Sequence, residues 1–209
     1  MFWNLTDPDS ERRLADAPED EEIRFREVHC PVEPKDHFGV RDRISPLSVV
    51  LPNLKPQDFV WTWAGECLVQ EGVLQLFRSE RFTGYEATPV QRVEFAHLLK
   101  KPPKLWEIVV KGSGGMASPE SGIRIVKVCP GCGLTDYSRI TRPTKLIDER
   151  RWDGTDFFRV EPVEGFIFVT DRVIRTLRIN AITGWKARPL EEMQASFDNV
   201  LLVDSSQVN

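Results

Sequence analysis

Cys129 and Cys132 stand in the stretch CPGCG, and their spacing is the feature of this chain most able to do chemistry. Two thiols separated by two residues, in a turn that contains glycine, can both point at one metal ion. A structural zinc site takes four ligands, which are mostly cysteine sulfurs and histidine nitrogens. Because the sequence contains a single CXXCG, this stretch supplies half of such a site.

The other half of a zinc site has to come from residues scattered along the chain. The candidates are the remaining cysteines and the three histidines: Cys30, Cys67, His29, His37 and His97. His29 and Cys30 are favoured because they stand where a second, N-terminal knuckle would lie. Two alternatives stay open. One is a metal-free turn with two reduced thiols, and the other is a redox-active pair, which usually opens a helix in a βαβ unit.

Other polar groups suggest less chemistry. Asp153 and Asp156 would bring two carboxylates close, but Asp-Gly-Thr-Asp is more typical of a turn that enters a strand. The glycines of residues 112–115 lack the Lys-Ser/Thr of a phosphate-binding loop, so we expect a flexible loop there. The histidines lie far apart in the sequence and indicate no catalytic set. We therefore expect a protein that is not an enzyme.

Trp61 and Trp63 alternate with Val60 and Thr62, so both indoles would face the same side of a strand. The simpler interpretation places both in the core. If the pair lay at an exposed rim, it would form a binding hot spot instead.

Length and composition fit one soluble globular domain. The chain has 209 residues, of which 41% are hydrophobic and 29% charged. No apolar run approaches the roughly 18 residues of a membrane span, and no signal peptide is evident at the N-terminus. Four cysteines, two of them in a CXXC, suggest a reducing compartment. We expect a cytoplasmic location and no membrane partner.

Acidic residues are concentrated at the N-terminus. Residues 1–36 contain eleven Asp or Glu and five Lys or Arg, a net charge of −6, and residues 16–22 are the densest acidic run. A block of like charge is typical of a solvated arm, so we expect residues 1–25 to be a partly irregular segment before an α+β domain at 26–209. The alternative is a contact surface for a basic partner. The basic cluster at residues 100–104 is too short to predict nucleic-acid binding.

Hydrophobic periodicity predicts an α+β domain with a mixed or antiparallel sheet. We expect helices at residues 66–78 and 171–180, with Asp171 as the N-cap or a first-turn acid. The buried stripe of the second helix would contain Val173, Ile174, Leu177 and Ala181. We expect strands at residues 23–28, 47–51, 59–63, 105–111, 123–128, 157–160, 166–169 and 200–203, and a loop at 112–122.

Residues 73–90 and 173–190 align without a gap at an offset of 100, with six identities. Each segment has the pattern of a helix, a stop and a strand. Gly84 and Gly184 can adopt a positive φ after the helix, and the odd positions of the following strand would face inward. The pattern predicts a unit that occurs twice around one sheet.

The order of motifs in the second half carries a family resemblance. The CPGCG stretch is followed by Trp-Asp-Gly-x-Asp-x-Phe-Arg at residues 152–159, by Thr-Asp-Arg at 170–172 and by Thr-Gly at 183–184. This order resembles the C-terminal part of the double-CXXCG family of bacterial proteins. The resemblance covers about the last 75 residues well, residues 59–128 loosely and the first 50 poorly. The matching positions are Cys129, Cys132, Gly133, Asp156, Phe158 and Arg159.

Proteins of that family are regarded as immunity proteins of polymorphic toxin systems. The resemblance therefore implies a non-catalytic protein that neutralises a cognate toxin by binding it directly, and it supplies no catalytic residues. The alternative is a zinc-knuckle adaptor or structural protein in another bacterial complex, including one associated with nucleic acid. A hydrolase or thiol enzyme ranks third. The single CXXCG departs from the family pattern and leaves a structural zinc as a hypothesis.

Overall fold

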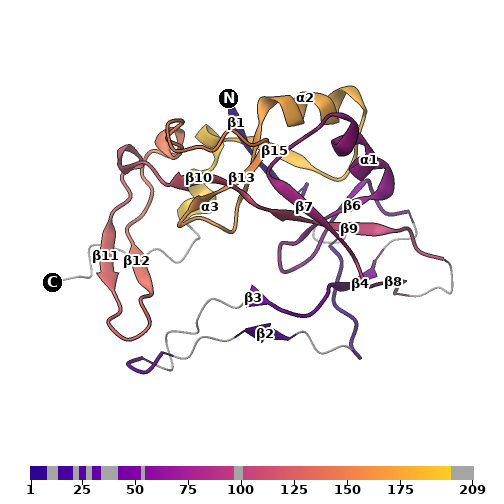
Figure 1. The fold of residues 1–209 in the computed structure, drawn as a ribbon, viewed down its shortest axis with the longest axis horizontal. Helices are drawn as coiled ribbons and strands as arrows, with labels where there is room; N and C mark the ends of the chain where they lie inside the picture. The colour runs from indigo at the N-terminus through magenta and orange to yellow at the C-terminus, as the bar shows by residue number, and fades with distance from the viewer. Residues whose placement is uncertain are drawn as a thin grey trace.

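The protein is a mixed α+β domain, as the hydrophobic periodicity predicted (Figure 1). The computed structural model describes residues 1–8, 14–20, 24–26, 30–33, 42–52, 55–96 and 101–198. In this part of the chain, no helix is long and apolar enough to cross a membrane.

The larger sheet has five strands in the order β10-β13-β14-β1-β15. Its strand β1 lies between β14 and β15 and is antiparallel to both, whereas β10 runs parallel to β13. The strands span Phe2–Thr6 (β1), Gly112–Met116 (β10), Phe157–Glu161 (β13), Ile167–Thr170 (β14) and Lys186–Pro189 (β15).

The second sheet has four antiparallel strands in the order β5-β6-β9-β7. These strands span Phe59–Trp61 (β5), Cys67–Gln70 (β6), Tyr85–Pro89 (β7) and Leu105–Val110 (β9). Its order corresponds strand for strand to β13-β14-β1-β15 of the larger sheet. In each case a helix follows the second strand directly: α1 is Glu71–Ser79 and α2 is Asp171–Ile179.

Contacts at corresponding positions of the two arrangements also match. The indole N–H of Trp106 donates to Glu71 at 2.7 Å, and that of Trp3 donates to Asp171 at 3.2 Å. Both carboxylates stand in the first turn of a helix, which confirms that role for Asp171; the N-cap of α2 is Thr170. The prediction that the unit occurs twice around one sheet is wrong, because the two units lie in two separate sheets. Their duplication stays a prediction. The structure shows that the two units occupy corresponding places and make corresponding contacts.

Gly84 and Gly184 adopt φ angles of +84° and +85°, as the sequence predicted. The left-handed residues immediately after the helices are Arg81 and Ala181, with φ of 54° and 50°. The two glycines come three residues later, where the chain passes close to the neighbouring arrangement. A Cβ on Gly184 would lie 2.7 Å from the Cβ of Gln57 and closer still to a backbone carbonyl oxygen. Glycine is therefore required for close approach as well as for its φ angle.

Three short pairs of strands surround the two sheets: antiparallel β2–β3, parallel β4–β8 and antiparallel β11–β12. They span Phe25–Arg26 (β2), Asp42–Arg43 (β3), Ser48–Leu51 (β4), Arg92–Phe95 (β8), Ile125–Val128 (β11) and Thr135–Tyr137 (β12). A third helix, α3, is Gln194–Asp198. The β11–β12 hairpin stands apart from the two sheets in Figure 1.

The main hydrophobic core joins both helices to both sheets. Phe77 of α1 and Phe157 of β13 are fully buried there with ring centroids 5.2 Å apart. Leu177 of α2 lies in the same core. Tyr85 and Ala87 of β7 pack against this core, as do Trp185, just before β15, and Ala187 of β15. The prediction that the odd positions face inward is therefore confirmed.

The expectation of an irregular segment at residues 1–25 is wrong for β1. This strand is hydrogen-bonded on both sides, and its Leu5 is 1% exposed. Pairing with strands distant in the sequence, rather than local pattern, therefore orders it. The predicted helix at 66–78 is also wrong at its start, because residues 67–70 form β6. The three apolar residues of that strand are buried on both faces, which hides the strand periodicity.

The predicted loop at 112–122 is wrong as well, since Gly112–Met116 form β10. A Cβ on Gly114 would lie 2.8 Å from Val160 and 2.9 Å from Phe158, so small residues let β10 approach β13. Ala181 is exposed and does not belong to the buried stripe of α2. The strand predicted at 200–203 lies outside the described residues. Of the strand predicted at 23–28, residues 24–26 are described, and Phe25–Arg26 form β2.

Candidate metal centre

Cys30, Cys129 and Cys132 come together in the structure, and their sulfur atoms all lie within 4.8 Å of one another. The sulfurs of Cys30 and Cys129 are 3.6 Å apart. Sulfurs bound to one tetrahedral zinc, each at about 2.3 Å from the metal, lie about 3.8 Å from one another. The three thiols are therefore close enough to hold one metal ion.

The end of β11 and the turn after it position two of these thiols. The backbone N–H of Cys129 donates to the Leu134 carbonyl at 2.8 Å, and that of Gly133 donates to the Cys129 carbonyl at 3.0 Å. Gly133 has a φ of +77°, which side chains other than glycine rarely adopt. These bonds close the CPGCG stretch into a tight turn with both sulfurs on one side.

The short segment at residues 30–33 brings the third thiol to this turn. The backbone N–H of Glu33 donates to the Cys30 sulfur at 3.2 Å, and the Glu33 carboxylate accepts from Lys127 at 3.1 Å. A Cβ on Gly131 would lie 3.1 Å from the Cβ of Val32, so glycine lets the two segments pack closely. A residue distant in the sequence thus completes the group of three.

The environment of the sulfurs favours one thiolate. The backbone N–H groups of Cys132 and Gly131 lower the pKa of the Cys129 thiol below its usual value. The N–H of Leu134 acts in the same direction on Cys132, but burial and the two neighbouring thiols together raise the pKa of Cys132. Thiolates are the form that binds metal. A bound cation would offset the repulsion between the thiolates, which otherwise disfavours a second ionisation.

The structure separates the predicted ligands into three groups. Cys30, Cys129 and Cys132 are brought together. Cys67 is 2% exposed in the main hydrophobic core, where burial, with the charge of Glu107, raises the pKa of its thiol. His29, together with His37 and His97, lies outside the described residues, so its predicted role stays a prediction.

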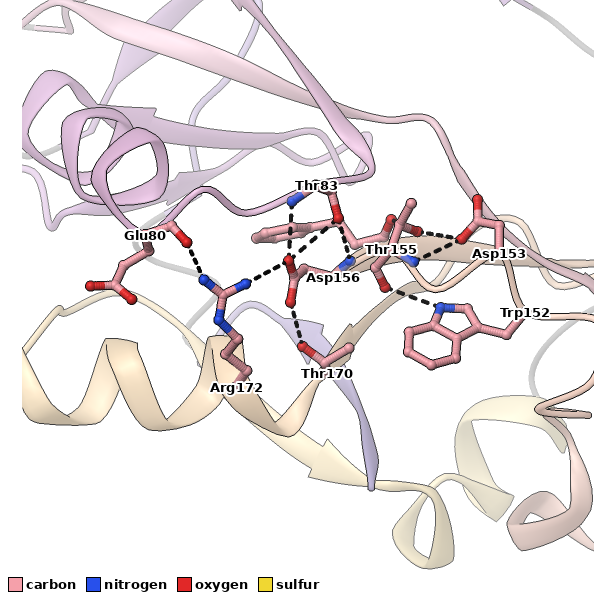
Figure 2. A network of polar contacts seen from close by, with 9 residues as sticks. Glu80, Thr83, Trp152, Asp153, Thr155, Asp156, Thr170 and Arg172 are labelled. Atoms are coloured by element: carbon pink, nitrogen blue, oxygen red, sulfur yellow. Dashed lines mark hydrogen bonds and ion pairs between the residues drawn. The ribbon is translucent and has the colours of Figure 1, made fainter.

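Asp156 of the Trp-Asp-Gly-x-Asp-x-Phe-Arg motif forms a different polar centre (Figure 2). Its carboxylate accepts from the Thr83 N–H at 3.1 Å, the Thr170 hydroxyl at 2.9 Å and the Arg172 guanidinium at 3.1 Å. Arg172 also donates to the Glu80 carbonyl and lies over the Phe82 ring. Asp156 itself is 7% exposed. It therefore links β13 to the end of α1 and the start of α2.

Asp153 does not act with Asp156 as a carboxylate pair. It accepts from the Ser113 N–H at 2.7 Å, and from the N–H and hydroxyl of Thr155 at 3.0 and 2.6 Å. These bonds make the turn that enters β13, as the residue types indicated, and they lower the pKa of Asp153 despite some burial. Arg172 and Thr170 were not predicted as partners of Asp156, although both lie in a motif that carried the resemblance.

The two tryptophans of the predicted strand have different environments. Trp61 is 6% exposed and donates to the Gly184 carbonyl at 2.9 Å, which confirms its place in the core. Trp63 is 59% exposed, so the expectation that both lie in the core is wrong. The strand ends at Trp61, and a turn closed by the Gly65 N–H and the Thr62 carbonyl carries Trp63 outward.

Comparison with protein-family models gives no match for this chain. A search of curated proteins finds no match either.

Proposed function

We propose that this chain is a non-catalytic binding protein of the immunity type, which neutralises a cognate bacterial toxin by direct contact. The observation that carries the proposal is the position of the motif residues. Asp156 accepts hydrogen bonds from Thr83, in the loop after α1, and from Arg172 of α2. Phe158 of β13 is 0% exposed and belongs to a second hydrophobic cluster with Val160 and Phe168. These residues stabilise a scaffold. Such use of a motif supports a protein whose specificity lies on its surface.

The scaffold also supports this function through its rigidity. A binder that blocks another protein gains affinity when its surface is ordered before contact, because less conformational entropy is then lost on binding. Asp156 orders the junction between the two sheets from one side. Asp58 does so from the other, where it accepts from the N–H and hydroxyl of Thr183 at 2.8 and 2.7 Å.

Rescue of cells is the direct test. We expect co-expression of this chain to restore growth to cells that produce the cognate toxin, and the purified proteins to form a stable complex. The toxin is found by using the chain as bait in its native host, or from a neighbouring gene with a secretion leader. The proposal would be contradicted if the toxin encoded by the neighbouring gene neither bound the chain nor was blocked by it.

We further propose that Cys30, Cys129 and Cys132 hold a structural zinc ion. Three sulfurs within 4.8 Å, with backbone N–H groups directed at two of them, support this assignment. Zinc would fasten residues 30–33 to the β11–β12 hairpin, which stands apart from the sheets in Figure 1. Its role would be to hold two surface segments together, and no reaction step is assigned to it.

Metal analysis tests the zinc site. We expect about one equivalent of zinc per chain in protein purified without chelator, because structural zinc sites bind tightly at neutral pH. Cys129→Ser should lose most of it, whereas Cys67→Ser, a matched change at a thiol outside the group, should keep it. His29→Ala tests the remaining predicted ligand. Less than a few tenths of an equivalent in the unchanged protein would overturn the assignment.

A zinc-knuckle adaptor is the second candidate function, and exposed apolar residues favour it. Ile125 and Val128 of β11 are 60% and 51% exposed, and Leu134 beside the thiol turn is 37% exposed. Apolar side chains grouped on a projecting hairpin suit contact with another protein. Identification of the captured partner separates the candidates, because an adaptor would bring down components of a host complex instead of a toxin.

A further inference from the structure

Residues 14–17 of the N-terminal acidic segment are hydrogen-bonded to the rest of the domain. The N–H of Ala15 donates to the Trp61 carbonyl at 2.7 Å, and the N–H of Trp63 donates to the Ala15 carbonyl at 3.3 Å. Asp16 exchanges two backbone hydrogen bonds with Val50 of β4, at 3.1 and 2.8 Å. The segment is thus held in extended form between β5 and β4.

A groove of about 620 Å³ lies along this segment. Its apolar wall contains residues from β4, β8 and the turn after β5, and its polar wall comes mainly from the acidic segment. The lining residues are Leu14, Asp16, Ala17, Glu19, Val50, Pro52, Trp63, Glu94, Phe95 and Ala96. A smaller cavity of about 170 Å³ adjoins it and shares Asp16, Ala17 and Trp63.

Aromatic and acidic groups meet in this groove. Trp63 is 59% exposed and lines the groove together with Asp16 and Glu19, both of which are exposed. Asp16 accepts a hydrogen bond from its neighbour Ala17 at 2.8 Å. The residues that line the groove in the described part of the chain include three carboxylates and no lysine or arginine.

A basic residue next to the groove offsets part of this charge. Arg92 of β8 pairs with Glu94 at 2.9 Å and with Asp20 at 3.0 Å. These pairs hold the acidic segment against β8. Asp16 and Glu19 are the two further carboxylates that line the groove. The groove thus combines an exposed indole with a negative wall, which suits a cationic side chain with an apolar stem.

We propose that this groove binds a lysine- or arginine-bearing segment of the protein partner, with the cationic group between Trp63 and the carboxylates of Asp16 and Glu19. The identity of that partner as a toxin rests on the proposed function. The chemistry of the occupant rests on charge complementarity and on the exposed indole. Trp63 would be the anchor of the contact, because exposed tryptophans that become buried dominate many protein interfaces.

A short cationic peptide tests the groove without the partner. In a titration with tetra-arginine peptide, followed by NMR, we expect the indole N–H signal of Trp63 to move and tetra-glutamate peptide to leave it in place. That signal is assigned by its loss in Trp63→Phe. The double change Asp16→Asn with Glu19→Gln should weaken peptide binding about five-fold or more. Glu149→Gln with Glu164→Gln, an equal loss of charge at exposed residues that do not line the groove, should not.

Two results would overturn the groove assignment. The first is a Trp63 signal that does not respond to tetra-arginine, which is also the result expected if another part of the chain or a second copy fills the groove. The second is equal weakening of peptide binding by the two double variants.

Experiments with the partner protein separate this inference from the proposed function. If the toxin is neutralised equally by the unchanged protein and by Trp63→Ala with Asp16→Asn, the groove fails while immunity stands. If the peptide binds at the groove but no toxin is bound, immunity fails while the groove stands.

Discussion

Gly84→Ala is expected to destabilise the protein by about 3–5 kcal/mol, because the new side chain meets two separate obstacles. Gly84 has a φ of +84°, a conformation that costs an alanine roughly 1–2 kcal/mol. Its Cβ would also lie 2.6 Å from the Cβ of Thr155 and closer still to the Phe157 carbonyl oxygen. Backbone at the junction of the two sheets would have to move. Urea unfolding measures the loss.

Gly65→Ala is the matched control for this change. Gly65 has nearly the same φ, +86°, but nothing lies within 4 Å of an added Cβ. We therefore expect a loss of only about 1 kcal/mol, from backbone strain alone. Similar losses in the two variants would mean that strain dominates at both sites and that the close approach at Gly84 is not needed.

The sequence predicted the elements whose periodicity is local. The C-terminal ends of both helices, the strands β9 and β13 and the inward positions of β7 follow from alternation or from helical spacing within about ten residues. It could not predict β1, whose Trp3 and Leu5 gain their partners from strands more than 160 residues away. It could not predict β10 either, because a glycine-rich strand has too few side chains to show a pattern.

The candidate metal centre was predictable in part for a related reason. The spacing of Cys129 and Cys132 indicates that both thiols point to the same side, because a turn typical of zinc sites joins them. Cys30 is 99 residues from Cys129, and only the fold brings their sulfurs to 3.6 Å. Its residue type made it a candidate, as it did Cys67, which the fold buries elsewhere. Trp63 shows the same limit, because the turn that exposes it lies just beyond the strand that its alternation predicted.

Asp156→Ala is expected to destabilise the protein by about 3 kcal/mol or more, because it removes the buried acceptor at the centre of a partly buried network. The Thr83 N–H and the Thr170 hydroxyl would lose an acceptor, Asp156, that is itself only 7% exposed. Arg172 would lose its ion pair, although its side chain is 46% exposed and water can solvate it. Most of the loss should therefore come from the Thr83 and Thr170 hydrogen bonds, which are partly buried. The free energy of unfolding in urea measures it.

Asp58→Ala is the matched control, since Asp58 occupies the corresponding place in the other arrangement. It accepts from the N–H and hydroxyl of Thr183, in hydrogen bonds that are exposed, so water can replace it. We expect a loss of about 1 kcal/mol. Asp156→Asn keeps one carbonyl oxygen as an acceptor and should fall between the two. If Asp156→Ala cost no more than Asp58→Ala, the motif carboxylate would not be what joins the two sheets, and the structural role assigned to this motif under the proposed function would lose its main support.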